Sequence, residues 1–183
     1  MGDSDYQLRW PRIGAVAAVA LLVAFLVWLL VIKDDDDNGS SNATSAPAAA
    51  SEAELASLAD ELGHPIYWAG PQNGSQLELE QSDGDVFLRY LTGDANVGTP
   101  QQDYLTVGTY PFPNALAVLK DLAKDEGSLT NETPDGGFVL TNQGNPTSVY
   151  IAFPDEDLQI EVYDPDPERA FEIATSGDIT PVE

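Results

Sequence analysis

Carboxylates are the most abundant side chains that could do chemistry in this chain of 183 residues. It holds 31 Asp and Glu residues, a single histidine and no cysteine. These counts exclude disulfides, thiolate metal sites, cysteine nucleophiles and multi-histidine metal sites. Acid–base chemistry by carboxylates remains, and a glycosidase would need two carboxyl groups about 5–10 Å apart. Glu161 is the best single catalytic candidate, because a predicted hairpin places it beside Tyr150 and Tyr163. The simpler interpretation is that Glu161 belongs to a solvated polar face of a strand.

The single histidine, His64, follows a predicted helix over residues 52–62. A general base would need a nucleophile and an orienting acid nearby, and the chain contains no Gly-x-Ser-x-Gly nucleophile motif. A ring just past a helix end can instead bond the last carbonyl groups and face the negative end of the helix dipole. We therefore expect a structural role for His64.

Two acidic segments could attract calcium. Residues 164–168 (Asp-Pro-Asp-Pro-Glu) lack the glycine and the spacing of an EF-hand loop, and helix capping by Asp166 explains them more simply. Residues 155–157 (Asp-Glu-Asp) lie at the tip of a predicted hairpin. We predict no dedicated metal site and no cofactor, and at most weak calcium binding at these segments.

Aromatic side chains are the other candidates for ligand binding. A groove for a sugar or a peptide could be lined by Tyr67, Trp68, Tyr150 and Tyr163, together with Tyr104 and Tyr110. In a small domain most aromatic residues belong to the core instead.

The elements that must position these side chains alternate between helices and strands. Capping residues and apolar periodicity predict helices over residues 52–62, 114–126 and 167–176. The strands between them are joined by tight turns, which antiparallel strands allow. The predicted fold class is α+β, an antiparallel sheet with helices packed on one face.

One hairpin is specific enough to predict a register. Asp83-Gly84 is a strong two-residue turn signal, and it places Leu79 opposite Leu88 and Glu78 opposite Arg89. The pattern predicts one apolar face and one polar face. We expect the Glu78–Arg89 pair to be exposed and to contribute at most about 1 kcal/mol.

The first part of residues 51–183 also carries a distinctive sequence pattern. The predicted helix runs into Gly63-His64-Pro65, and Tyr67-Trp68-Ala69-Gly70-Pro71 follows after one residue. Residues 104–110 (YLTVGTY) and 157–165 (DLQIEVYDP) continue the similarity. The chain resembles a group of uncharacterised bacterial proteins anchored by a single membrane pass. The resemblance implies a cell-surface location, and it implies no activity, ligand or site residue.

The N-terminal part predicts a membrane anchor. Residues 13–32 are apolar and uncharged, and twenty helical residues span about 30 Å, the thickness of the hydrocarbon core of a bilayer. Arg9 and Arg12 precede this segment and Lys33 follows it, which favours a cytoplasmic N-terminus. A cleaved signal peptide would have a shorter apolar core and a nearer cleavage site, and a buried core helix is a weak alternative for such a run.

The predicted organisation has four parts. Residues 1–12 form a short cytoplasmic tail, residues 13–32 a transmembrane helix, residues 33–50 a flexible acidic and Ser/Asn/Ala-rich linker, and residues 51–183 an extracytoplasmic domain. Four Asn-x-Ser/Thr patterns begin at Asn38, Asn42, Asn73 and Asn131, and such matches are common by chance in this composition.

Charge restricts the possible partners. The formal net charge is −24 and the sequence pI is about 4.1, whereas nucleic-acid binders present basic patches. We therefore expect no nucleic-acid partner, contact with the lipid bilayer through residues 13–32, and an unidentified extracytoplasmic ligand or partner. The leading interpretation is a non-enzymatic, membrane-anchored binding protein. The alternatives are a cell-surface hydrolase that uses carboxylates and an accessory subunit of a membrane complex.

The charge density generates a prediction about stability. Residues 51–183 hold 25 acidic and four basic side chains, a net charge of −21, so most carboxylates repel one another. The screening length falls from about 30 Å at about 0.01 M salt to about 10 Å at about 0.1 M. We expect the melting temperature of this domain to rise as NaCl is raised over this range and beyond, with a larger effect per ion for Ca²⁺ or Mg²⁺. A melting temperature that is indifferent to both salts would contradict the prediction.

Overall fold

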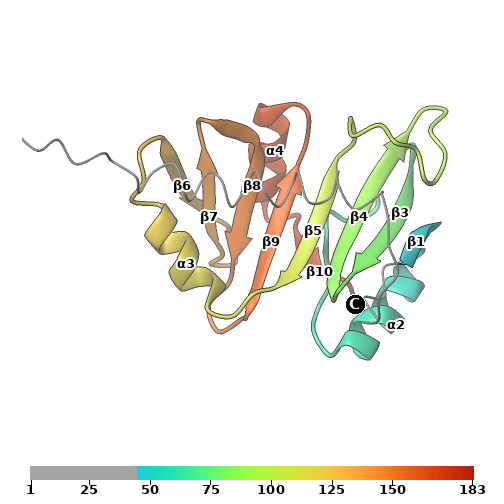
Figure 1. Cartoon of the computed structure of the whole chain (residues 1–183), viewed down its shortest axis with the longest axis horizontal. Coiled ribbons are helices and arrows are strands. Elements are labelled where there is room, and N and C mark those ends of the chain that lie inside the picture. Colours follow the sequence, from blue (N-terminus) through green and yellow to red (C-terminus); the bar gives the residue numbers. More distant parts are fainter. Residues whose placement is uncertain (1–44) are drawn as a thin grey trace, which may run out of the picture. The chain divides into compact units, whose positions relative to one another are not determined.

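The computed structural model describes residues 45–183, so the predicted tail 1–12, the membrane segment 13–32 and linker residues 33–44 lie outside the described residues. The described part is an α+β fold with three helices and a large antiparallel sheet, as predicted (Figure 1). In chain order the elements are β1 (Ser45–Ala49), α2 (Glu52–Leu62), β2 (Tyr67–Trp68), β3 (Ser75–Ser82), β4 (Asp85–Thr92), β5 (Thr106–Pro111), α3 (Ala115–Leu122), β6 (Ser128–Glu132), β7 (Phe138–Asn142), β8 (Asn145–Ala152), β9 (Leu158–Tyr163), α4 (Pro167–Ser176) and β10 (Thr180–Pro181). Among the described residues, no helix is long and apolar enough to cross a membrane.

Eight strands form one sheet in which every neighbouring pair is antiparallel. Their order is β1-β3-β4-β5-β9-β8-β7-β6, so β5 and β9 meet in the centre. β2 and β10 form a separate two-stranded sheet. Next to this pair the backbone N–H of Val182 donates to the carbonyl of Ile66 at 2.9 Å, which joins the C-terminal end to the segment after α2.

The predicted hairpin registers are confirmed. Asp83 and Gly84 have φ of 53° and 92°, the positive values that a type I′ turn requires at both positions. Glu78 lies opposite Arg89, as expected. In the β8–β9 hairpin Glu161 lies opposite Tyr150, and Ser148 lies opposite Tyr163.

Capping residues set the ends of α2 and α4 as predicted. In α2, Ser51 and Glu54 form a capping box, in which the Ser51 N–H donates to the Glu54 carboxylate at 2.8 Å. In α4, Asp166 accepts from the first backbone N–H groups, and Gly177 ends the helix in the left-handed conformation. By contrast, α3 ends at Leu122 rather than at residue 126, because short turns replace the helical hydrogen bonds after it.

One face of the large sheet is covered by α4 and α2. Val107, Val162 and Val149 follow one another across β5, β9 and β8, and they share an apolar core with Ala170 and Ala174 of α4. α2 packs on the same face over β3 and β4. We call this the α4 face.

The third helix covers the opposite face, so the prediction that the helices share one face is wrong. Val139 of β7 belongs to the core of the α4 face, and its neighbours Phe138 and Leu140 therefore point the other way. Lys120 of α3 lies over the Phe138 ring, 5.8 Å from its centroid, which places α3 on that side (Figure 1). We call it the α3 face. Strands β7 to β9 carry large apolar or aromatic side chains on both faces, and both faces must be covered.

Part of the predicted linker is a strand. Residues 45–49 form β1, which pairs with β3 through Ala48 opposite Leu79 and Ala49 opposite Glu78. The prediction of a flexible linker through residue 50 is wrong for these residues. The segment has no apolar periodicity and cannot bury a core of its own, but β1 instead satisfies backbone groups along β3 that would otherwise lie at an open edge.

Both edges of the large sheet are poor templates for another strand. Pro47 removes a donor from β1. In β6 the hydrogen-bonding pattern turns the N–H groups of Ser128, Thr130 and Glu132 outward. The Ser128 N–H already donates to the Asp125 carbonyl at 3.2 Å, and the Glu132 N–H donates to its neighbour's side-chain amide oxygen at 2.8 Å. This leaves Thr130 to offer the remaining outward N–H of β6, so strand addition is disfavoured.

Candidate functional site

The connection between β4 and β5 is unusually long for an antiparallel pair. Residues 93–105, which we call the 93–105 loop, contain no helix or strand. Hairpin loops usually have two to five residues, and long loops without secondary structure are commonly functional. The end of this loop is anchored, because Leu105 is buried in the core and its carbonyl accepts from the Tyr90 N–H at 2.9 Å.

A buried ion pair lies beneath the 93–105 loop. Arg89 Nε lies 2.6 Å from Glu78 Oε1, and the two side chains are only 11% and 1% exposed. The predicted pairing is confirmed, but the prediction that the pair is exposed is wrong. The loop folds back over the α3 face at this end of the sheet and removes the pair from solvent, which the hairpin register alone does not indicate.

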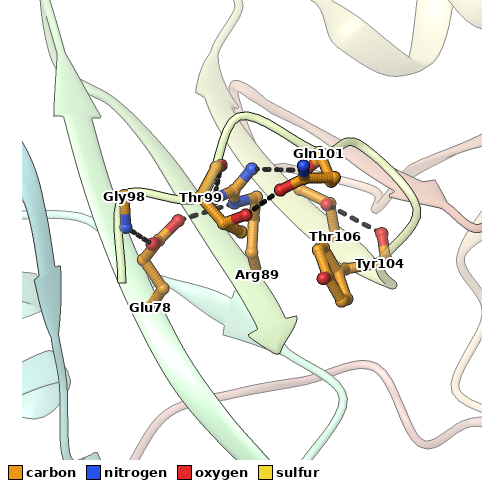
Figure 2. A network of polar contacts seen from close by, with 7 residues as sticks. All are labelled: Glu78, Arg89, Gly98, Thr99, Gln101, Tyr104 and Thr106. Atoms are coloured by element: carbon orange, nitrogen blue, oxygen red, sulfur yellow. Dashed lines mark hydrogen bonds and ion pairs between the residues drawn. The ribbon is translucent and has the colours of Figure 1, made fainter. Parts of the chain in front are cut away.

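The ion pair also holds the backbone of the loop (Figure 2). Glu78 Oε2 accepts from the Gly98 N–H at 2.5 Å. The guanidinium of Arg89 donates to the carbonyls of Thr99 and Gln101 at 2.9 and 3.1 Å. Hydrogen bonds with an ionised partner are roughly twice as strong as neutral ones. We call Glu78, Arg89 and these three loop contacts the Glu78–Arg89 clamp.

The clamped loop borders an open polar depression of about 540 Å³. It is lined by residues between Thr92 and Gln101 and by Tyr104. Asp94 contributes a carboxylate to the lining, and Asp103 adds a second exposed carboxylate to the same loop. Such a lining suits a neutral polar or cationic group and disfavours an anionic one.

The four nominated aromatic residues do not form a common groove. Tyr67 stacks on Phe153 at 5.3 Å in the core of the α4 face, and its hydroxyl donates to Glu156 at 2.9 Å. Trp68 belongs to the core beneath α2. Tyr150 and Tyr163 lie on the α3 face. The first two are therefore core residues, as the simpler interpretation expected.

Two of the aromatic residues lie in the loop or beside it. Tyr104 lines the depression. The pKa of Tyr163 is raised by partial burial and by the nearby carboxylates of Asp103, Asp164 and Glu161. Because Asp103 belongs to the 93–105 loop, Tyr163 lies close to the end of this loop. The sequence alone does not separate Tyr104 and Tyr163 from the other aromatic residues, because periodicity cannot indicate which loop covers which strand.

Glu161 is buried rather than solvated. It is 7% exposed, and its Oε2 accepts a hydrogen bond from the Tyr110 hydroxyl at 2.7 Å. Burial and the adjacent Glu161 carboxylate raise the pKa values of Tyr110 and Tyr150 well above the usual range. The prediction of a solvated strand face is therefore wrong at this position. Glu161 does not line the depression under the 93–105 loop.

The remaining nominated groups bind other parts of the protein. His64 Nδ1 lies 3.0 Å from the Pro65 carbonyl oxygen. Asp166 caps α4, as expected, and Asp164 forms an ion pair with Arg169 at 2.9 Å. At the 155–157 tip, the Asp157 carboxylate accepts from the backbone N–H of Asn114, just before α3, at 2.8 Å. In residues 45–183 no group of three or more His, Cys, Asp or Glu side chains is arranged to hold a metal ion.

Comparisons of this chain with protein-family models, curated proteins and solved structures find no match. The resemblance to membrane-anchored bacterial proteins therefore stays a prediction.

The burial of the Glu78–Arg89 clamp generates a prediction about stability. Arg89→Met leaves the Glu78 carboxylate buried without a cation, and we expect a loss of about 3–5 kcal/mol in the free energy of unfolding. The double variant Glu78→Gln/Arg89→Met removes both charges and should recover part of this loss. Urea unfolding of the full chain in a non-ionic detergent, followed by tryptophan fluorescence, measures both values.

The matched control for this cycle is Lys124→Met. It breaks the Lys124–Asp121 pair, whose side chains are 76% and 80% exposed, and should change the free energy little. If Arg89→Met costs no more than Lys124→Met, the ion pair is not the buried clamp described above.

Proposed function

We propose that this protein is a membrane-anchored binding protein and that the clamped 93–105 loop is its recognition site. Residues 13–32 would anchor it, with residues 1–12 in the cytoplasm and residues 45–183 on the other side of the membrane. The observation that carries the proposal is the buried Glu78–Arg89 clamp, because it holds an otherwise irregular loop around an open depression.

The free-energy cost of the clamp supports this proposal. Removing two charges from water is expensive, and apolar residues of similar volume are often as stabilising as a buried ion pair. A clamp that contributes little net stability but fixes three backbone groups of a loop is well suited to maintaining the shape of a binding surface. Binding residues are also disproportionately found on loops held by a rigid scaffold.

Charge and sheet geometry narrow the kind of partner. Asp94 and Asp103 lie in a domain with a net charge of −21, so a neutral polar or cationic group is favoured over an anionic one. The two edges of the large sheet offer few free donors, which argues against binding by strand addition. The 93–105 loop, which lines an open depression, offers a recognition surface that does not depend on a free sheet edge.

A carboxylate-dependent hydrolase is the second candidate. Asp85 is half-buried, and burial together with Asp83 raises its pKa to about 6, a value useful to a general acid. Asp85 and Glu161 both raise the pKa of Tyr110, so both carboxylates lie near the same phenol. Against this candidate, Tyr110 and Glu161 are bonded to each other and buried, which leaves little room for a substrate. A role as an accessory subunit, with residues 13–32 as the contact, is the third candidate and depends on the anchor.

Site-specific photo-crosslinking tests the recognition site. A photoreactive residue replaces Asn96, which is exposed on the loop, in the full chain in its native cells. The matched control position is Glu172, which is exposed on α4. We expect a defined adduct at position 96 and none at position 172.

The same crosslinking experiment also tests the role of the Glu78–Arg89 clamp. Arg89→Lys keeps the positive charge but loses the guanidinium fork that reaches both loop carbonyls, so the adduct at position 96 should fall several-fold. Lys124→Met should leave the yield unchanged. Equal labelling at the two positions, or a yield indifferent to Arg89→Lys, would contradict a binding site in the 93–105 loop.

The membrane topology is tested separately. Protease added to intact cells or spheroplasts should digest residues 45–183, because two arginines precede the apolar segment and four aspartates follow Lys33. Detergent-lysed cells provide the control for accessibility. Complete protection of the domain while the membrane is intact, with digestion after lysis, would reverse the proposed orientation.

A further inference from the structure

A second polar group is buried on the α3 face, apart from the clamped loop. Glu161 of β9 lies opposite Tyr150 of β8, and Ser148 lies two residues before Tyr150 on the same face. Glu161 and Ser148 are therefore diagonal neighbours on adjacent strands, with side chains close enough to interact through one small bridging group. Glu161 is 7% exposed and Ser148 is fully buried.

The hydrogen bonding of this pair is incomplete within residues 45–183. Glu161 Oε2 accepts from the Tyr110 hydroxyl, but Glu161 Oε1 is buried and has no hydrogen-bond partner among these residues. Ser148 Oγ is likewise buried without a partner that meets hydrogen-bond geometry, and the Tyr150 hydroxyl lies near both Ser148 and Glu161. Buried polar atoms are nearly always bonded, and an unpaired buried carboxylate is especially unfavourable. Two such oxygens on one face indicate that a bound ion or small molecule lies between them.

No basic side chain in the described part of the chain balances Glu161. Arg89 pairs with Glu78, Lys124 with Asp121 and Arg169 with Asp164. The fourth basic residue, Lys120, lies over the Phe138 ring. All four are accounted for elsewhere, so the negative charge of Glu161 has no counter-charge from residues 45–183.

The packing around Glu161 is specific. Gly108 of β5 lies directly opposite Glu161, and a Cβ at this position would come within 2.6 Å of the Tyr110 hydroxyl oxygen. The absence of a side chain at Gly108 therefore allows the Tyr110 ring to lie across the strand and to bring its hydroxyl to Glu161. Phe87 packs edge-on against the Tyr110 ring at 5.5 Å and holds it there.

We propose that Glu161 and Ser148 bind a single monovalent metal cation, Na⁺ or K⁺, in this buried position. The available ligands are a carboxylate oxygen and a serine hydroxyl, with the Tyr150 hydroxyl on the same face, and hard cations prefer oxygen ligands. One carboxylate balances one positive charge. A divalent ion usually requires more carboxylates, and none of the described residues forms such a cluster. Because Glu161 and Ser148 are buried, a bare ion, which needs less room than an organic amine, fits better.

Thermal melting of the full chain in a non-ionic detergent tests this site. NaCl and KCl are compared with N-methyl-D-glucamine chloride, each at about 1 M, where the screening length is about 3 Å for all three salts. General screening of the acidic surface is then matched, and a remaining difference reports binding to the folded state. We expect the wild-type chain to melt several degrees higher in NaCl or KCl than in the bulky organic salt.

Variants assign the difference to the site. Glu161→Gln should abolish the difference between the salts, whereas Glu172→Gln removes an exposed carboxylate from α4 and should retain it. Ser148→Ala removes one ligand and should shift the stabilisation to higher cation concentrations, which keeps the test open if Glu161→Gln does not fold. Equal melting of the wild-type chain in the three salts, or an undiminished difference in both site variants, would overturn the proposal. Stabilisation by methylammonium chloride alone would assign the site to an amine and overturn it as well.

Discussion

Positive charge is the scarce component of this protein, and its placement determines how the polar parts of the fold are arranged. Residues 45–183 hold 25 carboxylates and four basic side chains. Of these four, only Arg89 enters a buried ion pair with a fully buried carboxylate in the sheet. This placement fixes the 93–105 loop, because the guanidinium can satisfy Glu78 and two loop carbonyls at once. Asp121 pairs with Lys124 and Asp164 with Arg169, and the remaining carboxylates must lie in solvent, cap helices, bond neutral donors or acquire a cation from outside.

The two faces of the large sheet meet this constraint differently. The α4 face is an apolar core in which β-branched and small residues pack beneath α4 and α2, and it needs no charge. The α3 face carries Glu78 at one end and Glu161 near the centre, both buried. Glu78 is balanced by Arg89, whereas Glu161 is bonded to a neutral phenol. The proposed binding loop and the proposed cation site therefore both arise from buried carboxylates on the same face.

Local order was predictable from the sequence wherever a short-range rule applied. The Asp83-Gly84 turn set the register of β3 and β4, because a two-residue loop leaves one way to pair the strands. Ser51 with Glu54, and Asp166 with Pro167, marked the starts of α2 and α4, because each side chain satisfies backbone groups only a few residues away. The aromatic site candidates were less predictable, since Tyr67 and Trp68 belong to cores while Tyr150 and Tyr163 lie on the α3 face.

The sequence by itself determined the fold class, the hairpin registers, the helix caps and the excess of negative charge, all of which depend on residue type and on spacing along the chain. Only the tertiary structure decided which polar residues are buried. Glu78, Arg89 and Glu161 alternate along their strands like solvent-facing residues, and it is the return of the 93–105 loop and the packing of α3 that give this face a cover. The tertiary structure likewise decided that residues 45–49 form a strand, because that pairing depends on the free edge of β3 rather than on the composition of the segment. Burial of these groups depends on contacts between distant segments, and neither periodicity nor composition carries that information.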